Sequence, residues 1–261
     1  MLSLWSMSKI TILSSDEIIL MRKSCQLAAR TLEFIKPFVK VGVSTEELDK
    51  IVHDYILSHG AQPSPLGYHG YPKSICTSVN DVVCHGVPNS TTILKDGDII
   101  NVDVTCFLGG FHGDTSATFE VGAVSKKAHD ITVTAYECMM KGIEAITPMG
   151  TTGDIGFAID KHATRKGYTT VKEIGGHGIG RTFHDEPFVP SFGKKGKGAK
   201  LIPWRCLTVE PMINETAALL REHDVVNSSI KWYTTGDNTL SAQFEHTVLI
   251  TDTGYEILTL P

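Results

Sequence analysis

The sequence lacks the features that mark several large classes of protein. No apolar run reaches the ~18 residues of a membrane span, and Ser3, Ser6 and Lys9 interrupt the beginning of the chain, which is untypical of a signal peptide. The six cysteines form no C-x-x-C pair, so neither a thiolate zinc site nor a disulfide framework is indicated. The 24 Lys and Arg are slightly outnumbered by 29 Asp and Glu, for a net charge of −5, which argues against a DNA-binding protein. We therefore expect a cytoplasmic protein with reduced thiols, no membrane segment and no specific DNA partner.

What is present is an ordinary globular composition. Hydrophobic residues make up 41% and charged residues 20% of 261 residues. A chain of this length can bury a large core, so we expect a single domain over 1–261. Met7 is an alternative to Met1 as the first residue.

Apolar periodicity and capping residues predict four helices, over 14–39, 44–60, 128–146 and 152–167. Ser14 with Glu17, and Ser44 with Glu47, have the spacing of a capping box. Thr152 is the expected cap of the fourth helix.

A β-hairpin is predicted at 99–121. Residues 99–108 alternate between apolar and polar, and Gly109-Gly110 then suits a two-residue turn. In the resulting register Asp103 and Asp114 are diagonal neighbours on one face, with Cβ atoms ~7 Å apart. Two carboxylates this close are solvated, share a proton or hold a cation. Further strands are expected at 75–79, 82–84, 168–174, 207–212, 243–251 and 255–259.

The two halves of the chain show signs of an internal repeat. An offset of 107 residues relates Gly60 to Gly167, and Asp103 to Glu210, within similar patterns. The same offset relates Leu48 to Ile155, Val52 to Ile159, Leu94 to Leu201, Ile100 to Leu207 and Val102 to Val209. This predicts two α/β halves, about 12–121 and 122–261, with pseudo-twofold symmetry.

Further chemically active residues lie in the second half. His177 lies in the glycine-rich segment GGHGIG, and Glu210 and Glu245 lie within apolar strands. Either acid alone would be read as part of a buried salt bridge. With Asp103 and Asp114, however, the set of four carboxylates and one imidazole suits two divalent first-row cations in a hydrolytic site.

Seven ordered motifs then reveal a resemblance. They are YHGYPKS at 68–74, VCHG at 83–86, NVDV at 101–104, FHGD at 111–114, GHGIG at 176–180, TVEPM at 208–212 and AQFEH at 242–246. The chain resembles type I methionine aminopeptidases over residues 12–259, in their short bacterial form without an N-terminal zinc-binding extension. The resemblance implies the α+β pita-bread fold, in which helices lie on the outer face of a curved antiparallel sheet.

The resemblance also implies a role for each of the five ligands. Asp114 and Glu245 would bridge two divalent ions, Asp103 would complete one site, and His177 and Glu210 would complete the other. The working metal is left open among Co, Mn, Fe, Zn and Ni.

Three residues carry implied catalytic roles. His85 matches the histidine that contacts the scissile amide, and His184 matches the one that helps hold the substrate carbonyl and the tetrahedral intermediate. Glu210 would also shuttle a proton from water to the leaving amine. The implied reaction removes the initiator methionine when the second residue is small.

The methionine side chain would enter an apolar pocket, since aromatic and thiol walls suit a thioether. Besides His85 and His184, the substrate-binding residues assigned by motif are Tyr68, Tyr71, Cys76, Phe183 and Trp232. Pro65 stands where many members have cysteine, and residues 214–231 depart from the family pattern in length.

Further partners are implied. A monovalent cation is expected near Asn80, Val82 and Ser241. The substrates would be the N-termini of nascent polypeptides, and we expect a monomer. A basic loop could contact the ribosome transiently, although a solvated loop is the simpler reading; its lysines are Lys194, Lys195, Lys197 and Lys200.

Three alternatives remain at this point. A proline-directed aminopeptidase of the same fold would share the five ligands. An iron(II) oxygenase would use the pattern H-x-D…H formed by His112, Asp114 and His177. A non-catalytic binding module on this fold would typically have lost ligands, whereas all five are present.

Overall fold

The computed structural model describes residues 12–261, so the choice between Met1 and Met7 lies outside the described residues. The helices are α1 (Ser15–Ile35), α2 (Thr45–Ser58), α3 (Lys126–Glu144) and α4 (Thr152–Lys166), with 3₁₀ turns at Lys36–Phe38 and Tyr68–Gly70. The strands are β1 (Gln62–Pro63), β2 (Cys76–Val79), β3 (Val82–Cys84), β4 (Ile99–Leu108), β5 (Phe111–Glu120), β6 (Thr169–Thr170), β7 (Gly176–Ile179), β8 (Asp185–Val189), β9 (Cys206–Val209), β10 (Met212–Asn214), β11 (Leu220–Asp224), β12 (Lys231–Thr235), β13 (Ser241–Gln243), β14 (Glu245–Ile250) and β15 (Tyr255–Ile257).

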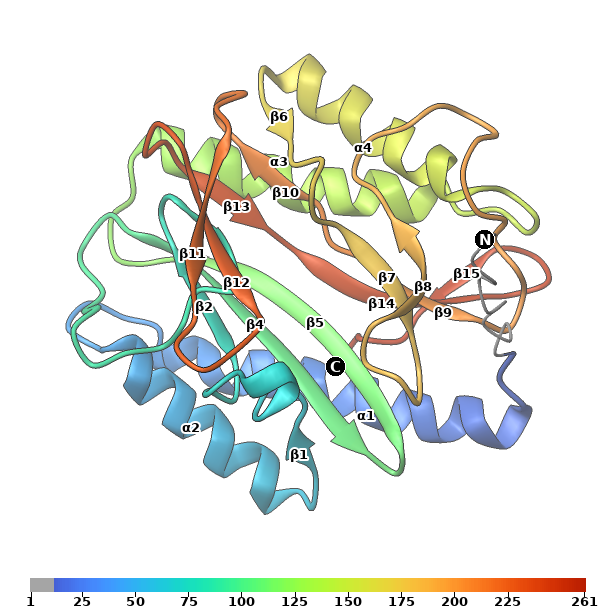
Figure 1. The fold of residues 1–261 in the computed structure, drawn as a ribbon, viewed down its shortest axis with the longest axis horizontal. Helices are drawn as coiled ribbons and strands as arrows, with labels where there is room; N and C mark the ends of the chain where they lie inside the picture. Colours follow the sequence, from blue (N-terminus) through green and yellow to red (C-terminus); the bar gives the residue numbers. More distant parts are fainter. Residues whose placement is uncertain (1–11) are drawn as a thin grey trace, which may run out of the picture.

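A large antiparallel sheet organises the molecule. Its main path is β1-β4-β5-β14-β9-β7-β8, with β2 added on β4 and β15 on β14. Two three-stranded sheets, β13-β10-β6 and β11-β12-β3, accompany it. Figure 1 shows the large sheet curving through the middle, with α1 and α2 along one side and α3 and α4 along the other. The predicted α+β class, a curved antiparallel sheet covered by helices, is confirmed.

Each helix pair packs on its own part of the sheet. Apolar residues of α1 and α2 pack against alternate residues of β4, from Ile100 to Cys106, all fully buried. Those of α3 and α4 pack against β9 and β14 in a second cluster. Because side chains alternate along a strand, the intervening residues of β4, including Asp103 and Thr105, point away from the helices. The packing of the helices thus directs the acidic residues to the inner face of the sheet.

The β4–β5 hairpin has the predicted register. Leu108 pairs with Phe111, Thr105 with Asp114, and Asp103 with Ser116. Both turn glycines have positive φ, 63° and 87°, the region where glycine carries no steric penalty.

The helix boundaries agree with the capping signals, with two corrections. Ser14 and Ser44 each form the expected capping box. The first helix ends at Ile35 rather than at residue 39, because Pro37 cannot continue the α-helical hydrogen bonding. Thr151, not Thr152, caps α4, through a capping box with Asp154.

Several predicted strands are shorter than expected or are divided. Of residues 168–174 only Thr169–Thr170 pair. The segment 207–212 divides into β9 and β10 at Glu210-Pro211, since proline has no N–H for the ladder. The segment 243–251 divides at Phe244, where the chain leaves the β13-β10-β6 sheet and enters the large sheet.

Two other expectations concern the chain as a whole. Within residues 12–261, no helix combines the length and the apolar character that a membrane crossing needs. All six cysteines are buried free thiols. The division into two repeated halves stays a prediction.

Candidate metal centre

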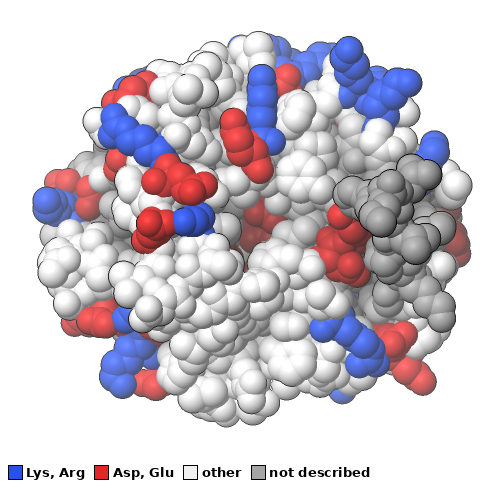
Figure 2. All heavy atoms as spheres, viewed as in Figure 1, with Lys and Arg blue, Asp and Glu red and all other residues white. Residues whose placement is uncertain are grey.

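Five sequence-predicted ligands come together on the inner face of the large sheet. Asp103 lies on β4, Asp114 on β5, His177 on β7 and Glu245 at the start of β14, while Glu210 directly follows β9. All five line one cavity of about 180 Å³. Figure 2 shows acidic side chains recessed in a hollow near the centre of this face. The residues come from both halves of the chain, so the cavity is formed only by tertiary folding.

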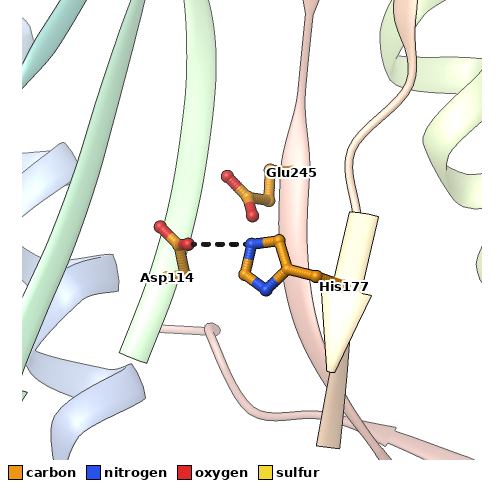
Figure 3. Close-up of side chains that lie close together, drawn as sticks. All are labelled: Asp114, His177 and Glu245. Carbon is orange, nitrogen blue, oxygen red and sulfur yellow. Dashed lines mark ion pairs between the residues drawn. The ribbon is translucent and has the colours of Figure 1, made fainter. Parts of the chain in front are cut away.

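Three of these side chains are in close proximity. One ligand atom each from Asp114, His177 and Glu245 lies within 4.8 Å of the others, and Figure 3 shows the three side chains pointing toward a common centre. The Nε2 atom of His177 lies 3.8 Å from Asp114 Oδ2. It also lies 3.5 Å from Glu210 Oε1.

The protonation of His177 decides what this centre can hold. Its Nδ1 lies 3.0 Å from the carbonyl of Gly178, so Nδ1 carries the proton and Nε2 presents a lone pair. Burial lowers the pKa of His177 to about 4, so the ring is neutral at pH 7. A lone pair therefore faces carboxylate oxygens, an arrangement of acceptors only, which a cation satisfies.

The four carboxylates have the same requirement. Burial is the largest cause that raises the pKa of Asp103, Asp114, Glu210 and Glu245. For Asp114 the neighbouring charge of Asp103 raises the pKa further, and for Glu245 that of Asp114 does. Divalent cations would offset both the loss of hydration on burial and the repulsion between neighbouring carboxylates. One imidazole with four carboxylates is also a donor set that first-row metals accept. The residues present therefore fit a divalent metal centre.

Comparison with known proteins agrees with this chemistry. A model described as "Metallopeptidase family M24" matches residues 19–252. This chain belongs to metallopeptidase family M24.

Curated relatives within the family carry consistent names. Methionine aminopeptidase A of Synechocystis is 48% identical over 255 residues, which cover 96% of this chain and 98% of the relative. The methionine aminopeptidase of Escherichia coli is 44% identical, covering 96% of this chain and 94% of the relative.

Solved structures match as well. The crystal structure of methionine aminopeptidase from Rickettsia prowazekii has a TM-score of 0.93 at 46% identity, covering 97% of this chain and all of that chain. A Xaa-Pro dipeptidase from Bacillus anthracis has a TM-score of 0.75 at 22% identity and covers 95% of this chain but 61% of that one. The second match shows the shared fold alone, and the expected pita-bread fold of the family is confirmed.

Several residues that hydrogen-bond to the predicted metal ligands, and so orient them, had not been predicted from the sequence. Thr105 donates to Asp114 Oδ1 at 2.6 Å. Thr208 donates to Glu210 Oε1 at 2.8 Å and accepts a bond from the His177 backbone N–H at 2.9 Å. Gln243 Nε2 donates to Glu210 Oε2 at 3.2 Å. The hairpin register already paired Thr105 with Asp114, and Thr208 lies two residues before Glu210, so both contacts could have been found. The bonds from the His177 N–H to Thr208 and from Gln243 to Glu210 join segments far apart in the sequence and carry no local signal.

Two further histidines line the same cavity. His85 Nδ1 lies 3.0 Å from the Lys231 carbonyl, and burial lowers the pKa of His85. His184 Nδ1 lies 2.9 Å from the Tyr68 hydroxyl. Burial, reinforced by the nearby His177, lowers the pKa of His184 to about 3. Both imidazoles are therefore neutral at pH 7.

Four of the five residues predicted for the apolar wall line the cavity. The lining of the cavity includes Tyr68, Tyr71, Cys76 and Phe183, together with Pro65. Trp232 is not among the lining residues: it borders a neighbouring cavity of about 570 Å³. Its ring stacks on His223 at a centroid distance of 4.1 Å. Ile230 lies in the wall instead.

The oxygenase alternative required His112 beside Asp114 and His177. His112 Nδ1 instead lies 2.8 Å from Ser64 Oγ, and its ring stacks on Phe183 at 5.4 Å. His112 is not part of the cavity lining. The H-x-D…H pattern is therefore not assembled as a metal site.

Proposed function

We propose that this protein is an aminopeptidase that hydrolyses the first peptide bond and releases N-terminal methionine, with a preference for a small second residue. The observation that carries the proposal is the neutral His177 whose Nε2 lone pair faces carboxylates inside a cavity with an apolar wall. The names and the high identity of the relatives support the same reaction.

Two divalent ions would be held by the five ligands. The side chains that would hold them are Asp103, Asp114, His177, Glu210 and Glu245, which all line one cavity. The bound ions supply Lewis-acid polarisation of water and of the scissile carbonyl. The donor set is compatible with Co, Mn, Fe, Zn or Ni.

Three side chains have further proposed roles in the reaction. His85, with its proton held on Nδ1 by the Lys231 carbonyl, presents Nε2 as an acceptor to the scissile amide N–H. His184 is held through Nδ1 by the Tyr68 hydroxyl and contacts the substrate carbonyl, where negative charge develops. Glu210, fixed by Thr208 and Gln243, takes a proton from the attacking water and delivers it to the leaving amine.

The methionine side chain would occupy the apolar wall formed by Tyr68, Tyr71, Cys76 and Phe183. Tyr71 is held by its hydroxyl, whose single O–H is shared between the carbonyls of Ile75 and Gly86, at 3.2 Å from each. A rigid aromatic wall selects length and polarisability at low entropic cost.

A monovalent cation near Asn80, Val82 and Ser241 is also part of the proposal. The Ser241 hydroxyl is buried and has no hydrogen-bond partner among residues 12–261. The Ser241 N–H donates to the Asn80 carbonyl at 2.9 Å, which brings the two residues together, and Asn80 has a positive φ of 53°. An orphaned buried hydroxyl beside such a turn is compatible with a K⁺ or Na⁺ ligand.

The decisive test compares two peptides, Met-Gly-Met-Met and Ala-Pro-Ala. The protein is stripped with chelator and then assayed with and without restored Co(II) or Mn(II). We expect metal-dependent release of methionine from the first peptide only. Cleavage of the second alone would favour a proline-directed enzyme, and no cleavage despite bound metal would favour a binding module.

The substrates would be the N-termini of nascent chains. The enzyme would act on them as a monomer in the cytoplasm, where its six free thiols stay reduced.

The four lysines between 194 and 200 are exposed, on a loop that packs on the start of α4. Figure 2 shows Lys and Arg side chains gathered over this part of the molecule. A variant with these lysines changed to Glu should co-sediment less with ribosomes, and unchanged co-sedimentation would exclude this surface.

A further inference from the structure

The hairpin β11–β12 carries a loop, residues 225–230, that we call the wall loop. It lies in the segment where the chain departs in length from the family pattern. The strands on either side pair in regular antiparallel register, from Leu220–Thr235 to Asp224–Lys231. The wall loop therefore projects from a regular support, and its position depends on what it contacts at its tip.

The wall loop is hydrogen-bonded to the 3₁₀ turn Tyr68–Gly70. The His69 carbonyl accepts two hydrogen bonds, from Ser228 Oγ at 2.9 Å and from the Ser229 N–H at 3.0 Å. At Gly70, whose φ is +84°, a Cβ would lie 2.4 Å from the Asn227 carbonyl oxygen. Only glycine permits this approach, so the backbones of the turn and the loop are in direct contact.

The anchoring residue Ser228 also holds Ile230. The Ile230 N–H donates to Ser228 Oγ at 3.0 Å. Ile230 and Trp232 both pack against the buried cluster of Tyr71, Cys76 and Val225, but only Ile230 of the two lines the catalytic cavity. Tyr71 and Cys76 belong to the proposed methionine wall, so Ile230 extends that wall into the cavity.

We infer that Ile230 is a specificity-determining residue of the methionine pocket and that Ser228 positions it. The inference rests on the proposed function and names the residue that completes its binding wall. A branched aliphatic side chain beside Tyr71 and Cys76 gives the pocket a filled, apolar boundary in contact with a thioether. The next residue, Lys231, holds His85 through its carbonyl, and a substitution at position 230 leaves that carbonyl in place.

The test compares Ile230→Ala with Val226→Ala, which truncates an exposed residue of the same loop (81% exposed). The substrates are Met-Gly-Met-Met and Phe-Gly-Met-Met, with Mn(II) restored. For Ile230→Ala we expect KM for the methionine peptide to rise about 10-fold or more, in the range for lost apolar contacts in a pocket. We expect kcat to stay within about twofold, and the preference for Met over Phe to fall. Val226→Ala should match the wild type.

The positioning role of Ser228 has its own matched control. Ser228→Ala removes the hydroxyl that serves both His69 and Ile230, whereas Ser229→Ala retains the backbone N–H that bonds His69. We expect Ser228→Ala to raise KM and to lower the Met-over-Phe preference at unchanged thermal stability, and Ser228→Thr to restore both. Ser229→Ala should change neither.

The outcomes separate this inference from the proposed function. If the wild type does not cleave Met-Gly-Met-Met with metal restored, the proposed function fails. If the wild type is active but Ile230→Ala behaves like Val226→Ala, or if Trp232→Leu alone changes the Met-over-Phe preference, the inference is wrong and the function stands. Should Ile230→Ala fail to fold, Ile230→Val, which removes one methylene, provides the same comparison with a smaller expected change.

Discussion

At the scale of single residues, hydrogen bonds made away from the cavity decide what each histidine presents to it. His177 and His85 both have Nδ1 next to a backbone carbonyl, and both are neutral because they are buried. Each therefore presents a lone pair on Nε2. The surroundings of His177 are carboxylates, which suits it to hold a metal ion, whereas His85 shares the cavity without belonging to the close group of Asp114, His177 and Glu245. Identical tautomers thus serve different roles.

This difference leads to a prediction for His85→Ala. The variant should bind divalent metal as the wild type does, because no ligand is removed, but kcat should fall by about 10²–10⁴-fold, the usual contribution of a positioned acid–base or hydrogen-bonding group. Metal content and steady-state kinetics measure the two effects. His129→Ala, at an exposed ion pair with Glu120, is the matched control. A kcat within threefold of the wild type would contradict the assignment, and His85→Gln serves if the alanine variant does not fold.

Substitution of a predicted metal ligand, unlike that of His85, should weaken metal binding as well as turnover. Asp103→Asn keeps the size of the side chain and removes its charge, so metal affinity should fall at least tenfold and turnover should be lost. Titration calorimetry with Mn(II) and the peptide assay check both effects. Asp252→Asn, at an exposed position, controls for the loss of one acid. Near-normal activity of Asp103→Asn in metal-controlled buffer would refute the role of Asp103.

At the scale of secondary-structure elements, close packing of β5 on α1 holds the strand that carries Asp114. A Cβ at Gly113 would lie 2.4–2.6 Å from Cys25 N, Ser24 C and Cys25 Cα, all in the backbone of α1. Helix backbone cannot yield locally, so Gly113→Ala should destabilise the fold by about 1–3 kcal/mol or more. Urea unfolding measures the change. Gly254→Ala, where the added Cβ meets nothing within 4 Å, should be close to neutral, and equal stabilities of the two variants would contradict this packing.

The elements also explain which parts of the site could be predicted from the sequence. Strict alternation and a two-glycine turn determine a hairpin register locally, so the proximity of Asp103 and Asp114 followed from the sequence alone. Capping boxes are equally local, and both that were expected at the first two helices are present.

Features that depend on tertiary contacts were predicted less well. The break at Phe244 occurs because one segment serves two sheets, and no pattern within 243–251 indicates where the change falls. Trp232 is placed by β12, where it pairs with His223, whereas Ile230 is placed by the wall loop, which bonds to the His69 carbonyl. That contact joins residues 159 positions apart, so motif matching could not show that Ile230 lines the cavity.

At the scale of the whole molecule, the two helix-backed parts of the sheet meet at four buried carboxylates. The free energy of unfolding of the metal-free protein therefore depends on pH. Burial raises the pKa of Asp103 to about 7 and that of Glu210 to about 8, against ordinary values of 3.8 and 4.5. Burial lowers the pKa of several histidines, including His177 and His184, so at mildly acidic pH the unfolded chain binds protons there that the folded protein does not. Above about pH 7 the histidines are neutral in both states. From there to about pH 9 the folded metal-free protein binds more protons than the unfolded chain, because its carboxyl groups hold theirs. The free energy of unfolding then falls as pH rises through this interval.

The last prediction follows from this fall in the free energy of unfolding as pH rises. The Tm of the chelator-treated protein should decrease from about pH 7 to about pH 9, by roughly 2–4 °C for each kcal/mol lost in a chain of this size. Saturating Mn(II) should abolish or reverse the trend, since metal binding releases these protons and is itself favoured by high pH. Differential scanning calorimetry on metal-free and metal-loaded samples measures both. Glu210→Gln should flatten the metal-free profile, while Glu222→Gln, on an exposed strand, should not. A metal-free Tm that is constant or rises from about pH 7 to about pH 9 would mean that the buried carboxylates are balanced by something other than protons or metal.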